Sequence, residues 1–428
     1  MTRDEALTLL ESALSHCSAD SAVTTLSGSV ERATRYANNS ITQNVSGDRK
    51  TLTVTVSFGQ RTGSASTNQL DQDSLRSTAR RAEEAARAAD PDLEYLPPLP
   101  PQEYPTVNAW SDETAAATPT DRARIARAVA DGPAAAGDRA AGSVTTSVEF
   151  QAIANSAGLR AFHAATSARL LATIISEGAS GWAGMSSFDL SRIPVEEIAE
   201  RAWRKARDAR NPVEIEPAAT MVVLEPQAVA DLIQWIGWEA DAKAADEGRS
   251  VFSGQEGECL AAPSVTIRSV PGHPDVPGAP FADDGAPTGD VSWIEDGVLR
   301  SLPTTRFWAK TTGRQRVDFP GNLTMSGGDA STEDLIARAG TGLLVTRFWY
   351  IRSVDPMKLL LTGMTRDGLY RIDGGRLAGA AVNMRFNESP LRMLKNVIAI
   401  GRPEPTRDNI LAPPLLVRDF RFTSVTRF

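Results

Sequence analysis

Residues 220–247 read TMVVLEPQAVADLIQWIGWEADAKAADE, and this stretch sets the organisation of the second half of the chain. A short apolar strand, Thr220–Leu224, leads at Pro226 into a helical segment. The segment predicts one central helix over residues 226–247.

The residues after this helix form many short β-type runs separated by glycine and proline. The clearest runs are 264–270, 290–301, 341–351 and 368–382. Residues 216–428 are therefore predicted to be a β-rich C-terminal domain, mostly an antiparallel sheet or barrel around the central helix.

The first half predicts an α+β region of helices packed on antiparallel sheet. Apolar and polar residues alternate over 51–58, which indicates a half-buried strand, and an alanine-rich amphipathic helix follows over 73–89. These belong to a first module at 1–96, and the proline-rich residues 97–105 predict a semi-rigid linker. A second α+β module is expected at 106–215, packed with the first.

The composition excludes several classes of protein. The chain is 41% hydrophobic and 23% charged with a net charge of −8, and its longest basic run is a pair, so no nucleic-acid partner is expected. The N-terminus resembles an amphipathic helix and no stretch is apolar enough to span a membrane. With only two cysteines in 428 residues, Cys17 and Cys259, a reduced, cytoplasmic protein is expected.

Common catalytic motifs, such as a phosphate-binding loop or a nucleophile elbow, are missing from the sequence. The three histidines, His16, His163 and His273, lie far apart, and none has a second ligand at zinc spacing. His16 beside Cys17 suggests either a dyad or a cation at a helix end, and the second interpretation is favoured. No metal site is predicted, although one assembled from distant residues stays open.

Two acidic groups have alternative interpretations. Asp283 and Asp284 precede Gly285 in a loop rich in proline and glycine, which suits a cation site or, more simply, a set of Asx turns. Asp241, Asp246 and Glu247 suit a solvated face of the central helix.

A nine-residue segment, SVFSGQEGE over Ser250–Glu258, carries a family resemblance. In the catalytic branch of the TldD/PmbA family, a helix bears HExxxH, and a segment like SVFSGxxGE starts twelve residues after the second histidine. The same spacing places Ile233, Gln234 and Trp238 at the first histidine, the glutamate and the second histidine. The spacing is kept while all three chemical groups are replaced.

These replacements remove the chemistry of the motif. Ile233 and Trp238 offer no lone pair to zinc, and Gln234 cannot act as a general base. The catalytic branch also supplies a late cysteine ligand, whereas the tail here reads LAPPL over 411–415. The chain thus resembles the metal-free TldE/PmbA-type branch. Residues 288–299, 321–336 and 373–401 are similar to further family segments, in the family's order.

The resemblance implies a subunit, itself without a cofactor, of a cytoplasmic peptidase. Zinc is expected in a TldD-type partner that bears HExxxH, and the substrates are expected to be short or unfolded peptides. Candidate residues facing substrate or partner are Trp235, Trp238, Ser250, Phe252, Ser253 and Gly254. Two alternatives stay open: a metal-free binding or structural homodimer without a peptidase partner, and an active peptidase with unrecognised catalytic residues.

Overall fold

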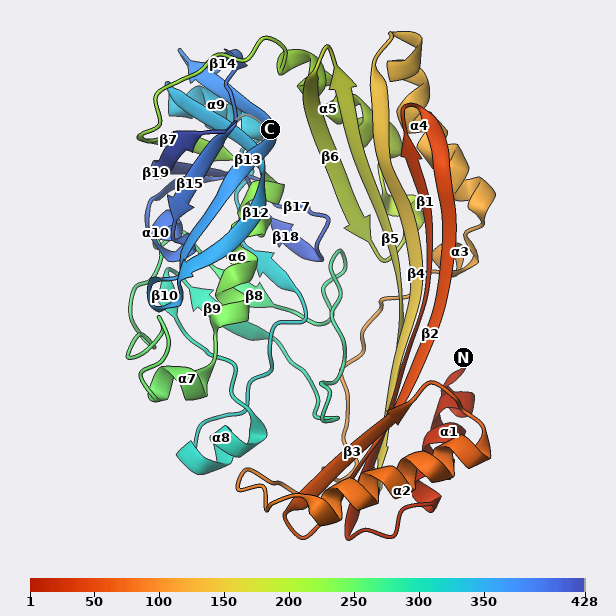
Figure 1. Cartoon of the computed structure of the whole chain (residues 1–428). Helices are drawn as coiled ribbons and strands as arrows, with labels where there is room; N and C mark the ends of the chain where they lie inside the picture. Colours follow the sequence, from red (N-terminus) through yellow and green to blue (C-terminus); the bar gives the residue numbers. More distant parts are fainter. Residues whose placement is uncertain (427–428) are drawn as a thin grey trace.

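A computed structural model describes residues 1–426 and contains three β-sheets (Figure 1). One long sheet belongs to the N-terminal half, and two smaller sheets belong to the C-terminal half. The fold class is α+β, as the sequence predicts.

The N-terminal sheet is antiparallel, with the strand order β3-β2-β1-β4-β5-β6. Its strands are β1 (Ser21–Ala37), β2 (Ser40–Phe58), β3 (Arg61–Thr67), β4 (Arg139–Asn155), β5 (Arg160–Ser176) and β6 (Ala179–Ser187). Because β1 pairs with β4 over fourteen residues, from Val23–Asn155 to Tyr36–Gly142, strands from both predicted N-terminal modules form one continuous sheet.

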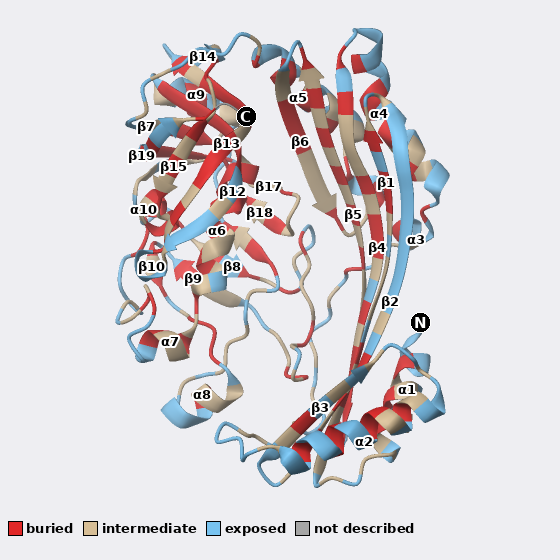
Figure 2. Ribbon diagram, viewed as in Figure 1, coloured by how far each residue is buried: buried red, intermediate tan, exposed pale blue. Residues whose placement is uncertain are grey.

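Helices cover one face of this sheet, as Figure 2 shows by the burial of their inner sides. They are α1 (Arg3–Ser15), α2 (Gln72–Ala88), α3 (Asp112–Ala116), α4 (Pro119–Ala135), η1 (Leu190–Arg192) and α5 (Val195–Asp208). Alternate residues of a strand point to opposite faces, so Leu26 and Ala152 face α1 and α2 while Ser27 and Gln151 face the other way. That second face looks toward the C-terminal half.

The segment between α2 and α3 contains the predicted proline-rich linker and forms neither helix nor strand. Its backbone carbonyl groups accept hydrogen bonds from both halves of the molecule. Asn155 Nδ2 donates to the Leu99 carbonyl oxygen at 2.8 Å, and Arg306 Nη2 donates to that of Pro97 at 2.9 Å. The linker is therefore fixed against the N-terminal sheet and the C-terminal half.

Five strands of the C-terminal half close into a barrel in the order β12-β7-β19-β15-β13, because β13 pairs back with β12. They are β7 (Ala219–Leu224), β12 (Gly342–Asp355), β13 (Leu360–Asp373), β15 (Met384–Glu388) and β19 (Leu415–Val425); β14 (Arg376–Ala380) and β16 (Val397–Ile400) pair onto it. All neighbours are antiparallel except β7 and β12. The predicted antiparallel sheet or barrel is confirmed.

A second small sheet has the order β10-β9-β8-β11-β18-β17. Its strands are β8 (Ile267–Ser269), β9 (Val291–Glu295), β10 (Val298–Leu299), β11 (Leu323–Met325), β17 (Glu404–Pro405) and β18 (Ile410–Ala412). Helix α6 (Pro226–Glu239) shares one hydrophobic core with this sheet and with the barrel. The remaining helices are α7 (Ala242–Asp246), α8 (Arg306–Thr312), α9 (Thr332–Ala339), η2 (Pro356–Lys358) and α10 (Pro390–Lys395).

The predicted single helix over 226–247 is wrong in one respect, because the helix breaks at Ala240. The backbone there is extended (φ −78°, ψ 120°). Asp241 then caps a new helix by accepting a hydrogen bond from the Ala244 amide, and the Ala242 amide donates to the Pro303 carbonyl oxygen at 2.9 Å. Side-chain capping and this tertiary bond compete with continuation of the helix. Within residues 1–426, no helix is both long and apolar enough to cross a membrane.

Candidate functional site

Helix α6 carries the three motif positions, and the side chain at the first of them, Ile233, points into the core. Ile233 is 1% exposed and lines an apolar cavity of about 20 Å³ together with Phe252 and Trp293. Trp238, by contrast, is 64% exposed at the end of the helix. Residues five apart on a helix differ in direction by about 140°, which separates these two side chains. The structure therefore does not bring Ile233 and Trp238 to one shared site.

The candidate segment after α7 forms a compact turn. Ser250 Oγ accepts a hydrogen bond from the Phe252 amide at 3.2 Å, and the Ser253 amide donates to the Ser250 carbonyl oxygen at 3.1 Å. Gly254 ends the turn with a φ of +68°, a conformation that glycine adopts without strain. The turn delivers Phe252, 1% exposed, to the same cavity as Ile233. The spacing between the helix and the turn thus places Phe252 beside Ile233 in one apolar core.

The two tryptophans of α6 contact each other at the surface end of the helix. The rings of Trp235 and Trp238 meet edge to face with centroids 5.1 Å apart. Trp235 is half-buried against the core, whereas Ser250 is buried and Gly254 exposed. Of the six candidate residues, Trp238 and Gly254 are the exposed ones.

The donor set around the motif does not fit a zinc ion. β18 packs against α6, and Ala412, in the tail that matches the family's cysteine position, is fully buried in the same core as Ile233. These side chains supply no ligand atom. Among the described residues, His, Cys, Asp and Glu nowhere gather in a group of three or more that could hold a metal.

The histidines and cysteines lie in separate environments. His16 Nε2 lies 3.4 Å from Gln72 Oε1, and Cys17 Sγ donates to the Ala13 carbonyl oxygen at 3.5 Å, so these neighbours have different partners. Both cysteines are free thiols, with Cys17 half-buried and Cys259 exposed. His273 accepts a hydrogen bond from the Asp275 amide at 3.2 Å within a turn.

The acidic loop residues form turn and ion-pair contacts. Asp284 Oδ1 accepts from the Ala286 amide at 3.0 Å, which is an Asx turn, and lies 3.2 Å from Arg316 Nη2. Asp283 Oδ1 accepts from Gln151 Nε2 at 2.9 Å across to the N-terminal sheet. Asp246 Oδ2 on α7 accepts a hydrogen bond from the Trp308 ring nitrogen at 2.8 Å, so Asp246 has a protein partner as well as solvent.

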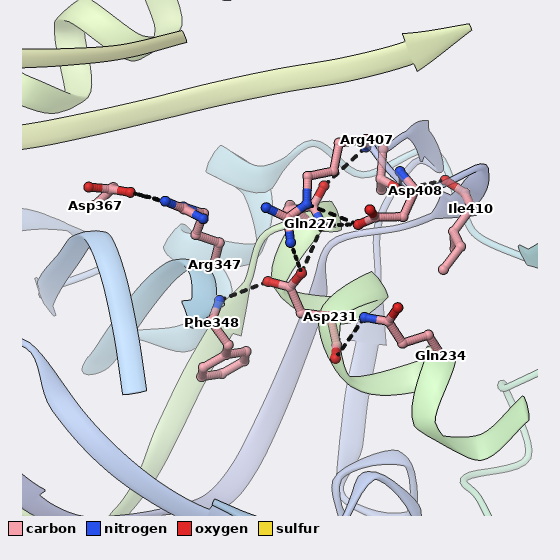
Figure 3. A network of polar contacts seen from close by, with 10 residues as sticks. Gln227, Asp231, Gln234, Arg347, Phe348, Asp367, Arg407, Asp408 and Ile410 are labelled. Atoms are coloured by element: carbon pink, nitrogen blue, oxygen red, sulfur yellow. Dashed lines mark hydrogen bonds and ion pairs between the residues drawn. The ribbon is translucent and has the colours of Figure 1, made fainter. Parts of the chain in front are cut away.

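A buried carboxylate lies one half-turn before the motif positions on α6 (Figure 3). Asp231 is 1% exposed and accepts three hydrogen bonds: from Gln227 Nε2 at 2.9 Å, Arg407 Nη2 at 3.1 Å and the Phe348 amide at 2.8 Å. Burial raises the pKa of Asp231 to about 6, although Arg407 and the two other donors act in the opposite direction. The carboxylate ties α6 to β12 and to the loop between β17 and β18.

Trp182 on β6 connects this network to the N-terminal sheet. The guanidinium carbons of Arg347 and Arg407 lie 5.0 and 5.8 Å from the centroid of its indole ring. Arg347 forms a buried ion pair with Asp367, whose other oxygen accepts from Ser180 at 2.7 Å. Two cations over one ring and a hydrogen bond beside them hold the two halves of the molecule together.

This network was not predicted from the sequence. The one sign of it in the sequence is Asp231, a charged residue inside the apolar run AVADLI. Charged residues are almost never fully buried unless they are paired, so such an aspartate predicts a partner. Two of its three partners, Phe348 and Arg407, lie more than a hundred residues away in sequence.

Three domain models of one protein family match successive parts of the chain. Models of the PmbA/TldA metallopeptidase domain 1, central domain and C-terminal domain match residues 26–86, 65–210 and 217–424 in that order. The chain belongs to this family. It is the TldD/PmbA family that the sequence resembles, so that prediction is confirmed.

Three solved structures share the fold of this family member over almost its whole length. They are TldE from Thermococcus kodakarensis (18% identity, TM-score 0.84, covering 98% of this chain and 99% of that one), and two proteins described as candidate modulators of DNA gyrase. One of these comes from Bacteroides thetaiotaomicron (20% identity, TM-score 0.86, covering 99% of this chain and 98% of that one). The other comes from Thermotoga maritima (18% identity, TM-score 0.84, covering 94% of this chain and 96% of that one). At these identities the likeness shows the fold alone.

A curated relative is named a metalloprotease, from Methanothermobacter thermautotrophicus. It is 24% identical over 237 residues, which is 51% of this chain and 51% of the relative. The matched part of this family member thus spans about half the length of that protein.

Proposed function

We propose that this chain is the metal-free, TldE-type subunit of a cytoplasmic two-protein zinc peptidase that degrades short or unfolded peptides. The observation that supports the proposal is the replacement of the three motif residues on helix α6. The spacing from α6 to the turn at Ser250 matches the family pattern, yet Ile233, Gln234 and Trp238 occupy the ligand and base positions. Ile233 packs in an apolar cavity, an environment that suits a structural helix.

The proposed role of the subunit is to enclose the partner's zinc centre. The TldD-type partner would supply HExxxH and the metal, and this chain would contribute a wall of the chamber. Trp238 is the proposed anchor, because a large exposed aromatic side chain at the end of a rigid helix suits an interface hot spot. Trp235 supports the ring of Trp238 from the core side.

The test is reconstitution with the HExxxH-bearing protein of the same organism. The purified chain, the partner and their mixture are compared by size-exclusion chromatography, metal analysis and cleavage of an unfolded peptide. We expect a complex that contains zinc only through the partner and cleaves peptides faster than the partner alone. Stoichiometric zinc and cleavage by the isolated chain would show that it is an active peptidase instead.

A pair of matched variants tests the anchor. Trp238→Ala is expected to weaken the complex by about tenfold or more, as truncation of an interface hot spot does. Trp110→Ala, which removes another partly exposed tryptophan on the N-terminal half, is the control and should leave affinity unchanged. If size-exclusion chromatography shows that the chain forms only a homodimer and does not bind the partner, the homodimer alternative is correct.

A further inference from the structure

Two large cavities adjoin one another, the first between the helix-free face of the N-terminal sheet and the C-terminal half, and the second lined mostly by the C-terminal half and reaching the sheet at Gln151. Their volumes are about 860 and 880 Å³. Both volumes lie in the range of ligand pockets, roughly 300 to 1,000 Å³. The cavities share walls at Gln151, Gly278 and Asp283, so they form two compartments of one groove.

The floor of the first compartment runs across five neighbouring strands. Cross-strand partners Ser27, Gln151 and His163 lie in one row, and Ser29, Glu149 and Ala165 lie in the next. Thr51 of β2 pairs with Ser27 and extends the first row, which therefore crosses the four strands β2, β1, β4 and β5. Three strand spacings of about 4.8 Å give this row a length of roughly 14 Å. An extended polypeptide of about four residues, at 3.3 Å per residue, has this length.

The chemistry of the floor matches a peptide backbone. Hydroxyl and amide side chains such as Ser27, Ser29 and Gln151 both donate and accept hydrogen bonds, and a backbone presents both kinds of group at every residue. Burial lowers the pKa of His163, which favours its neutral imidazole. The charged residues that line the first compartment are one cation, Arg49, and two anions, Glu149 and Asp283, and this mixture does not select a phosphate chain or a small cation.

A fixed loop divides the two compartments. Phe281 is buried against Tyr104, with ring centroids 5.3 Å apart, and the Tyr104 hydroxyl donates to the Gly285 carbonyl oxygen at 2.8 Å. Between these anchors, Asp283 accepts its hydrogen bond from Gln151 of the floor. The divider is therefore part of the folded structure and not a loose loop over an open face.

The second compartment offers apolar and charged surface beyond the divider. Trp293 forms part of its wall, held by a hydrogen bond from its ring nitrogen to Ser269 Oγ at 2.8 Å. Arg316, paired with Asp284 and Asp318, lies on another side. This compartment therefore presents an aromatic ring and a paired guanidinium group, whereas the first compartment presents many hydroxyl and amide groups.

We infer that this groove is a binding site for an extended, unstructured polypeptide and that the isolated chain binds such a segment without metal. The backbone lies across the floor at Ser27, Ser29 and Gln151, and a neighbouring side chain reaches the second compartment past Asp283. This inference rests on the proposed function, because it makes the metal-free subunit a holder of the substrate that the complex cleaves.

The experiment measures fluorescence anisotropy of a fluorescein-labelled dodecapeptide of alanine, serine, glycine and leucine, capped at both ends, with the full chain in EDTA. Saturable binding is expected. Ala165→Trp fills the floor and is expected to weaken binding about tenfold or more. Ala88→Trp, at an exposed position of α2 on the far side of the sheet, is the matched control and should bind as the unaltered chain does.

Circular dichroism establishes that each variant is folded, and Ser27→Trp, at an exposed position of the same floor, replaces Ala165→Trp if that variant does not fold. Absence of saturable binding, or equal binding by the floor variants, would overturn the inference. Neither result would contradict the proposed function. The proposed function would be contradicted if the isolated chain contained stoichiometric zinc or did not bind the HExxxH-bearing partner.

Discussion

Replacement of Asp231 by asparagine, an isosteric change, tests the buried network at its centre. The aspartate meets three donors and needs only acceptor atoms, one oxygen facing Gln227 and Arg407 and the other facing the Phe348 amide. Asparagine keeps one acceptor and points an NH₂ group at a donor. An unsatisfied buried donor costs about 1–3 kcal/mol, so Asp231→Asn should lower the free energy of unfolding by about 2 kcal/mol at pH 7.

The pH dependence of this loss has a definite sign. Burial raises the pKa of Asp231 from 3.8 to about 6 in the folded protein. A raised folded-state pKa means that the stabilising contribution of the protonated group is complete below the unfolded value and is lost as pH rises toward 6. Two pKa units correspond to roughly 3 kcal/mol. Because pH 4 still lies just above the unfolded value of 3.8, most of this contribution has returned there, and the stability gap between the original protein and Asp231→Asn should widen from about 2 to about 4 kcal/mol between pH 7 and pH 4.

Urea unfolding at pH 4, 5, 6 and 7, followed by tryptophan fluorescence, measures the gap. Asp73→Asn is the control, since the Asp73 side chain is 92% exposed and its ion pair with Arg76 lies at the surface. Such exposed pairs contribute little, so this control should differ from the original protein by less than about 1 kcal/mol at every pH. A gap for Asp231→Asn that stays constant or narrows on acidification would refute the reasoning.

Two further substitutions test the contacts around α6. Trp182→Leu removes the ring under Arg347 and Arg407 and should lower the free energy of unfolding by about 2–4 kcal/mol in urea titrations; an unchanged midpoint would contradict the role of these contacts. The double variant Ile233→His, Trp238→His restores two imidazoles, yet metal analysis should find no stoichiometric zinc because position 233 points into the core and position 238 into solvent. The same variant should be destabilised by about 2–5 kcal/mol, since a polar ring replaces Ile233 in an apolar cavity.

Local sequence patterns predicted the elements whose own residues decide their burial. The alternation over 51–58 gave the buried half of β2, where Leu52, Val54 and Val56 face α2. The strand actually begins at Ser40, and its first half is exposed without any alternating pattern. Pairing with β1 holds that half in place, and pairing between strands cannot be read from a polar segment by itself.

The same limit applies to the candidate site. The spacing from Trp238 to Ser250 located the motif helix and its turn, because both are local features of the sequence. It could not indicate that the turn brings Phe252 beside Ile233, which depends on the break at Ala240. Strand β12 and the loop at Arg407, which donate hydrogen bonds to Asp231, come beside α6 only in the folded chain. The buried network could therefore not be predicted from the sequence.

The three sides of α6 have different environments, and two of them hold the helix in place although its motif positions carry no histidine or glutamate. Ile233 fills an apolar cavity, Asp231 secures β12 and the loop at Arg407, and Trp238 extends into solvent. The first two contacts hold the helix without any metal, so its geometry needs no ligand. Such a helix can present a surface residue at a fixed place. In the proposed complex that surface meets the partner, while the groove on the N-terminal sheet holds the peptide.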